Sequence, residues 1–134
     1  MNPNSFVAPL DEVNNFLTNL KQILTSNQYD LDILPRKKGE DPLDPCTTEN
    51  TMQDLGYDTD DVKNDLLSLT EKDYIETILD DKDSSRPPFW VFGKTVKNNK
   101  DVYIKVKIRN KYTGKLFCVS FHYPKHPLKS SPYI

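Results

Sequence analysis

The clearest pattern of apolar and polar positions lies between residues 89 and 123, where it predicts three consecutive antiparallel strands joined by two tight turns. Residues 101–110 read DVYIKVKIRN, in which apolar and polar side chains alternate. This period of two is typical of a half-buried strand. We therefore expect one face of the sheet to lie in the core and the other to carry cations.

Thr113–Gly114 predicts the turn after this strand, because a glycine accommodates the positive φ of short hairpin loops. With these two residues as the loop, both strands place apolar side chains on the same face, so pattern and register agree. The cross-strand pairs expected on the polar face are Lys105 with His122, Lys107 with Ser120, and Arg109 with Cys118.

The first strand of the meander is expected from Phe89 to Val96, with a turn at Asn98–Asn99. A two-residue loop at these asparagines places Lys94 opposite Tyr103 on the polar face. It also places Trp90 and Phe92 on that face. A bulge at Gly93 would return them to the core.

Helical patterns dominate the chain before this meander. Apolar residues at three- and four-residue spacing predict a helix up to about Thr25, and capping residues begin shorter helices that follow. The four helices expected are 11–25, 48–55 ending at Gly56, 59–69, and 70–79. Residues 29–34 are expected to form a short extended segment ended by Pro35.

This order of elements predicts an α+β fold, with N-terminal helices on one face of a C-terminal antiparallel sheet of three or more strands. At 134 residues the chain is expected to form a single domain. Its parts are a disordered segment 1–9, a helical acidic part 10–80, a basic meander 86–123, and a proline-rich irregular tail 124–134 that folds back along the sheet.

Charge is distributed very unevenly along the chain. Up to Ser85 there are 7 Lys and Arg against 19 Asp and Glu, and from Arg86 onward there are 11 against 1. Such asymmetry indicates a basic binding face on the sheet. The alternative is that the two halves neutralise each other as complementary faces of the fold.

Several classes of protein lack support in the sequence. No apolar run is long enough to span a bilayer and the N-terminus has no signal-peptide pattern, so a soluble, cytoplasmic protein is expected. Cys46 and Cys118, with only two histidines in the chain, have no metal-type spacing and are expected to be free thiols. There is no glycine-rich phosphate loop and no G-x-S-x-G elbow, and no cofactor is expected.

Four motifs carry a resemblance to a known family. They are LTEKDY (69–74), Trp90, DVYIKVKI (101–108) and CVSFH (118–122). In order and spacing they resemble the MqsR group of bacterial type II toxins, within the wider RelE-like mRNA interferase fold. The resemblance covers roughly residues 58–123.

This resemblance implies a metal-independent endoribonuclease that cleaves mRNA, free or associated with the ribosome, and is inhibited by a cognate antitoxin protein. The tyrosine that MqsR proteins use falls on Tyr103, and a lysine of their last strand falls on His122. Two other positions depart from the family, since Glu76 stands in place of a lysine and Val91 in place of a glutamine.

Metal-free RNA cleavage needs a base for the 2′-hydroxyl, an acid for the leaving 5′-oxygen, and cations near the phosphate. His122 is the candidate base or acid, and Tyr103 is a candidate acid or phosphate donor. Lys105 completes the candidate catalytic set, because the expected pairing puts it beside His122, where it would lower the pKa of the imidazole. The candidate phosphate-binding residues are Lys94, Lys107, Arg109 and Arg86.

Each of these residues also has a structural interpretation. The strand cations are equally typical of a solvated face, and His126 is expected on the surface of the tail. The basic run Arg36–Lys38 is either a solvated loop or an extension of a phosphate-binding surface. At the level of function, the alternatives are a non-catalytic nucleic-acid or ribosome-binding module, and an interaction domain whose basic sheet docks an acidic partner.

Overall fold

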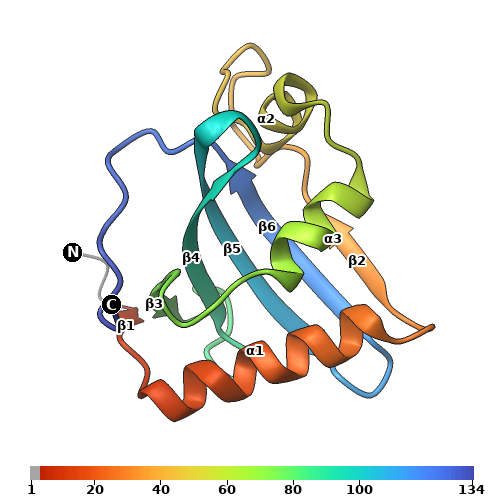
Figure 1. The fold of residues 1–134 in the computed structure, drawn as a ribbon, viewed down its shortest axis with the longest axis vertical. Coiled ribbons are helices and arrows are strands. Elements are labelled where there is room, and N and C mark those ends of the chain that lie inside the picture. Colours follow the sequence, from red (N-terminus) through yellow and green to blue (C-terminus); the bar gives the residue numbers. More distant parts are fainter. Residues whose placement is uncertain (1–3) are drawn as a thin grey trace.

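The computed structural model describes residues 4–134, and within them three helices pack on a six-stranded sheet (Figure 1). The helices are α1 (Leu10–Thr25), α2 (Thr48–Leu55) and α3 (Thr59–Leu67). The strands are β1 (Ser5–Phe6), β2 (Asp30–Ile33), β3 (Tyr74–Ile78), β4 (Phe89–Val96), β5 (Lys100–Asn110) and β6 (Lys115–His122). The predicted α+β class is confirmed.

The sheet has the strand order β1-β3-β4-β5-β6-β2. The predicted meander of β4, β5 and β6 forms its centre, and the extended segment before Pro35 is β2, which pairs in parallel with β6. The other neighbours are antiparallel. Long-range pairing thus brings β2 to the edge of β6, and β1 to the opposite edge of the sheet beside β3.

The main core lies between the helices and one face of the sheet. From the helices it takes the apolar stripe of α1, Val62 and Leu66 of α3, and Leu55 of α2. From β5 it takes the buried side chains of the even-numbered positions 102, 104 and 106. Figure 1 shows α1 and α3 lying across this face. The odd-numbered side chains of β5 therefore point to the opposite face.

The helix ends follow the capping residues that the sequence offers. Thr47 accepts a hydrogen bond from the Asn50 N–H, and Gly56 ends α2 with a φ of 69°. Asp58 and Asp61 form a reciprocal capping box at the start of α3. These caps fix both ends of the segment that leads from α2 into α3.

The predicted helix over 70–79 is wrong, because Tyr74–Ile78 forms strand β3. The Thr70 N–H donates to Asp73 Oδ2 at 2.9 Å, which closes a turn instead of beginning a helix. Both faces of β3 are covered, with Tyr74 in the main core and Ile75 in a second cluster on the other face. A strand buried on both faces has no alternation, so its apolar run resembles that of a helix.

The N-terminal segment also differs from expectation. Ser5 and Phe6 pair with β3, and the Ala8 N–H donates to the Tyr74 hydroxyl at 3.0 Å. The prediction of disorder for residues 1–9 is therefore wrong for 4–9, while 1–3 lie outside the described residues. A strand of two residues is too short to show an alternation of apolar and polar positions, so the sequence does not indicate its pairing.

The register between β5 and β6 differs from the predicted one. Asn110 Oδ1 accepts hydrogen bonds from the backbone N–H groups of Tyr112 and Thr113, so the turn begins before Thr113. As a result Tyr103 pairs with His122 and Lys105 with Ser120. The predicted pairing of Lys105 with His122 is wrong by two positions.

A second irregularity in this hairpin moves Cys118 to the core. The register shifts between the Lys105–Ser120 and Val106–Cys118 pairs, which leaves Val119 as an extra residue in β6. Cys118 is fully buried among the core residues. Its predicted place opposite Arg109 on the polar face is therefore wrong.

The register between β4 and β5 is offset by one residue from the prediction. The turn spans three residues, Lys97–Asn99, with both asparagines at positive φ. Gly93 then pairs with Tyr103, and Lys94 pairs with Val102 on the face of the helices. A one-residue offset moves every side chain of a strand to the other face. Trp90 and Phe92 therefore reach the core without the predicted bulge at Gly93.

The tail folds back along the second face of the sheet and ends beside β1 and β3 (Figure 1). Leu128 packs with Tyr103 against Ile75, Ile78 and Val91 in the second cluster. The Tyr133 hydroxyl donates to the Ala8 carbonyl, and its ring stacks on Tyr74.

In residues 4–134 no helix has the length and apolar character needed to cross a membrane.

Candidate functional site

A cavity of about 400 Å³ opens on the face of the sheet that faces away from the helices. Its lining comes from three places in the sequence. Ile75, Glu76, Tyr103 and His122 come from the strands, Lys37 and Glu40 from the loop after β2, and residues 124–129 from the tail. This volume lies within the roughly 300–1,000 Å³ that is typical of small-molecule sites.

Tyr103 and His122 form the floor of this cavity as cross-strand neighbours on β5 and β6. Their rings stack with centroids 5.3 Å apart and planes 17° from parallel. Of the residues predicted to act in catalysis, these two are brought together.

Helix α2 fixes the end of β6 on both sides of His122. The Phe121 N–H donates to Thr48 Oγ1 at 3.1 Å, and the Tyr123 N–H donates to Thr51 Oγ1 at 3.0 Å. Both threonines are buried. Two side-chain hydrogen bonds therefore hold the backbone of His122 where β2 no longer pairs with β6.

The hydrogen bond of His122 determines which of its nitrogens is free to act as a base. Nδ1 lies 2.9 Å from the backbone carbonyl of Tyr123, and a carbonyl oxygen can only accept. Nδ1 therefore carries the hydrogen, and in the neutral ring the lone pair is on Nε2.

Burial lowers the pKa of His122 below its ordinary value of 6.5, and the nearby ammonium groups of Lys37 and Lys125 lower it further. The neutral imidazole is thus favoured at pH 7. The sequence predicted this lowering of the His122 pKa but attributed it to Lys105. In the structure burial is the main cause, and the contributing lysines are Lys37 and Lys125.

Burial and the carboxylate of Glu76 raise the pKa of Tyr103 to about 12. The hydroxyl therefore stays protonated at neutral pH and is able to donate a hydrogen bond or a proton. The site pairs a proton acceptor with a proton donor on adjacent strands, which is an arrangement suited to acid–base chemistry.

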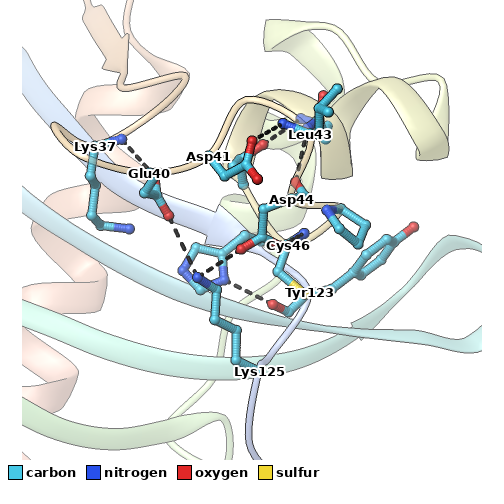
Figure 2. A network of polar contacts seen from close by, with 12 residues as sticks. Lys37, Glu40, Asp41, Leu43, Asp44, Cys46, Tyr123 and Lys125 are labelled. Carbon is cyan, nitrogen blue, oxygen red and sulfur yellow. Dashed lines mark hydrogen bonds and ion pairs between the residues drawn. The ribbon is translucent and has the colours of Figure 1, made fainter.

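A network of polar contacts joins the loop after β2 to the tail at one side of the cavity. The Lys37 N–H donates to Glu40 Oε1 at 2.6 Å. Lys125 Nζ lies 3.0 Å from Asp44 Oδ2 and 4.0 Å from Glu40 Oε2. Figure 2 shows Glu40 between Lys37 and Lys125. The contacts place two ammonium groups near His122.

The four predicted phosphate-binding residues lie apart from this cavity, each beside a carboxylate. Their ion pairs are Lys94–Asp73 on the helix face (3.8 Å), Lys107–Asp80 (3.0 Å), Arg109–Asp32 (3.2 Å) and Arg86–Asp83 (3.7 Å). Lys107 is buried, with 6% of its side chain exposed. These contacts favour the alternative in which the acidic and basic halves neutralise each other.

Lys105 lies on the same face as Tyr103 but points elsewhere. Its Nζ lies 4.8 Å from the centre of the Phe89 ring, and its cross-strand neighbour is Ser120. Burial and the charge of Lys37 lower the pKa of Lys105, whereas nearby carboxylates such as Asp81 raise it. It is a neighbour of the site and does not line the cavity.

Several residues of the site were missed by sequence reasoning. The basic run around Lys37 was the one signal available, and the structure places Lys37 in the lining of the cavity. His126 was expected on the surface and lines the cavity. Other lining residues, among them Glu40, Lys125 and Lys129, reach the site through tertiary contacts that no local spacing indicates. In the described part of the chain, no three His, Cys, Asp or Glu side chains gather in a possible metal site.

Comparison with known proteins identifies the family of this chain. No curated protein matches the sequence. A family model described as "Motility quorum-sensing regulator, toxin of MqsA" matches residues 9–123, which extends the resemblance of the motifs to the start of α1. The chain therefore belongs to the MqsR toxin family, the toxins of a toxin–antitoxin system, for which an antitoxin is the implied partner.

Proposed function

We propose that this toxin is an endoribonuclease that cleaves mRNA in the cytoplasm by attack of a 2′-hydroxyl, without a metal, and that its antitoxin inhibits this activity. The observation that carries the proposal is the stacked pair of Tyr103 and His122 at the floor of a cavity. One member is poised to accept a proton and the other to donate one at neutral pH.

In this mechanism, Nε2 of neutral His122 takes the proton of the 2′-hydroxyl as the 2′-oxygen attacks phosphorus. The bond between phosphorus and the 5′-oxygen breaks, and Tyr103 gives its proton to that oxygen. The products are a 2′,3′-cyclic phosphate and a 5′-hydroxyl. The proton gained by His122 then returns to the Tyr103 phenolate through solvent, which restores both residues.

Three lysines line the same cavity as His122, and of these Lys125 and Lys129 pair with carboxylates. Lys37 is therefore the cation best placed to stabilise charge on the phosphate. Within the described residues, neither Lys37 nor Lys105 has a carboxylate within ion-pair distance, unlike the four other predicted cations. We therefore propose Lys37 as a phosphate ligand, with Lys105 adding to the local positive charge.

The proposal is tested by replacing the two floor residues. We expect His122→Ala and Tyr103→Phe each to slow cleavage of a purified transcript by at least about 100-fold, the usual size of a lost general acid or base. Both variants are also expected to relieve growth arrest in cells. Tyr112→Phe is the matched control, because Tyr112 is 89% exposed in the β5–β6 loop.

Undiminished cleavage by both variants would contradict the proposed roles. A non-catalytic nucleic-acid module would give a different result. In that case RNA would bind with an affinity that falls steeply with salt, and no cleavage product would form.

A further inference from the structure

We propose that Pro124–Lys129 forms the wall of the cavity that receives one nucleobase of the RNA, and that Leu128 in this wall determines which nucleotide is cut. This inference rests on the proposed function, because it assigns a substrate contact to the same site.

The wall belongs to a part of the chain outside the family match. The matched region ends at residue 123, whereas half of the residues that line the cavity lie between 124 and 129. One side of the cavity is therefore bounded by a segment that lies outside the matched region.

Leu128 sits in a hollow that depends on Gly93 in the facing strand. A Cβ atom added at Gly93 would lie 2.9 Å from Leu128 Cδ1 and 3.2 Å from Ile75 Cδ1. The first distance is shorter than carbon atoms tolerate, so an alanine at this position would have to displace the end of the Leu128 side chain.

Polar contacts hold the wall on either side of Leu128. Lys125 Nζ lies 3.0 Å from Asp44 Oδ2, and Lys129 Nζ lies 3.1 Å from Glu76 Oε1. Further along, Ser131 Oγ donates to the Glu71 carbonyl at 3.1 Å. The cavity remains open with the tail held in this way, so the tail bounds the site and does not fill it.

The chemistry of the cavity suits a nucleotide. Leu128, Pro127 and Ile75 offer apolar surface beside the Tyr103 ring, and Lys37 and Lys125 supply positive charge near His122. Unpaired bases of single-stranded RNA bind in this manner, with the base against aromatic or apolar groups and the phosphate near cations. A base in a duplex is stacked and paired, so the ligand class is an unpaired nucleotide.

The first test is binding of the four nucleoside 3′-monophosphates to the full chain, followed by NMR of the Leu128 and Ile75 methyl groups. We expect one nucleotide to bind more tightly than the others and to shift both residues. Leu128→Ala should weaken its binding by about tenfold. Leu43→Ala, at a position 85% exposed, is the matched control and should bind as the wild type does.

Gly93→Ala tests the wall from the opposite side, because it displaces Leu128 without removing it. We expect the same loss of nucleotide affinity. If Leu128→Ala fails to fold, this variant still decides the question. Methyl groups that do not respond to any nucleotide, or wild-type affinity in both variants, would overturn the inference.

Mapping of cut sites in a long transcript separates this inference from the proposed function. We expect Leu128→Ala to cut at a broader set of nucleotides than wild type. An unchanged set of sites, cut more slowly or faster, would overturn the role of Leu128 in selection. If wild-type protein binds nucleotides but cuts no transcript, the proposed function fails while the binding wall stands.

Discussion

At the scale of single residues, the environment of His122 determines what the site is able to do. The Nδ1 hydrogen bond to the Tyr123 carbonyl leaves Nε2 as the acceptor, and burial keeps the ring neutral at pH 7. Tyr103, stacked on the same ring, keeps its proton because burial and Glu76 raise its pKa to about 12. Opposite pKa shifts in one cavity therefore support the proposed roles of His122 as the base and Tyr103 as the acid.

The pH dependence of cleavage follows from these shifts. In the proposed mechanism the active base is neutral His122, so kcat/KM should rise with pH and reach half its maximum below 6.5, the ordinary pKa of histidine. The fall caused by ionisation of Tyr103 should come only near pH 12. Initial rates on a short RNA between about pH 5 and about pH 9 check this expectation. A midpoint above 6.5, or a rate that falls through this range, would contradict it.

At the scale of elements, α2 positions the site although it does not line the cavity. Thr48 and Thr51 accept hydrogen bonds from the backbone on either side of His122. The capping contacts at Thr47 and Gly56 fix the ends of the helix that carries them. The site therefore depends on a helix on one side of β6 and on the tail on the other.

Thr51→Val tests this dependence. Valine keeps the shape of threonine but leaves the Tyr123 N–H without its acceptor, so the free energy of unfolding should fall by about 1–3 kcal/mol. Cleavage by the folded variant should also slow, because the backbone of His122 is less constrained. Urea unfolding and RNA cleavage measure the two effects. Thr18→Val, at an exposed position of α1, is the matched control, and an equal effect of both variants would count against the account.

Comparison of the predicted and observed elements shows which parts of the fold local sequence patterns predict. The helices α1, α2 and α3 and the β4–β6 meander follow from periodicity and caps, and all were predicted. Strand β3 was not, because burial on both of its faces hides the alternation. The predicted strand registers were wrong where the length of a turn determines them, at Asn98–Asn99 and at Asn110. An asparagine side chain or a positive φ changes a loop by one or two residues without altering the pattern of the strands.

At the scale of the whole molecule, the two charged halves of the sequence meet in the fold. Every ion pair in the described residues joins a cation from Arg86 onward to a carboxylate before it. The sequence showed the charge asymmetry, but only the fold determines which cations pair with carboxylates.

Tyr103 and His122 were predicted from sequence motifs, whereas Lys37 and the tail reach the cavity through contacts between distant segments.

This matching predicts a weak dependence of RNA binding on salt. Near the cavity, Lys37 and Lys105 are the described lysines that have no carboxylate within ion-pair distance. If RNA meets about two or three lysines there and no others, the slope of log affinity against log salt concentration should be about −2 for single-stranded RNA. Fluorescence anisotropy with the His122→Ala variant, which should bind without cutting, measures this slope. A slope steeper than about −5 would indicate that most of the basic half contacts RNA.

The most direct measurement of the central claim uses an RNA with one 2′-deoxynucleotide at the cleavage position. If His122 activates the 2′-hydroxyl as the nucleophile, this substrate should bind normally and remain uncut, while the all-ribose RNA yields a 2′,3′-cyclic phosphate end. Mass spectrometry of the products distinguishes the two outcomes. Cleavage of the deoxy-substituted RNA at the same position and rate would contradict the account.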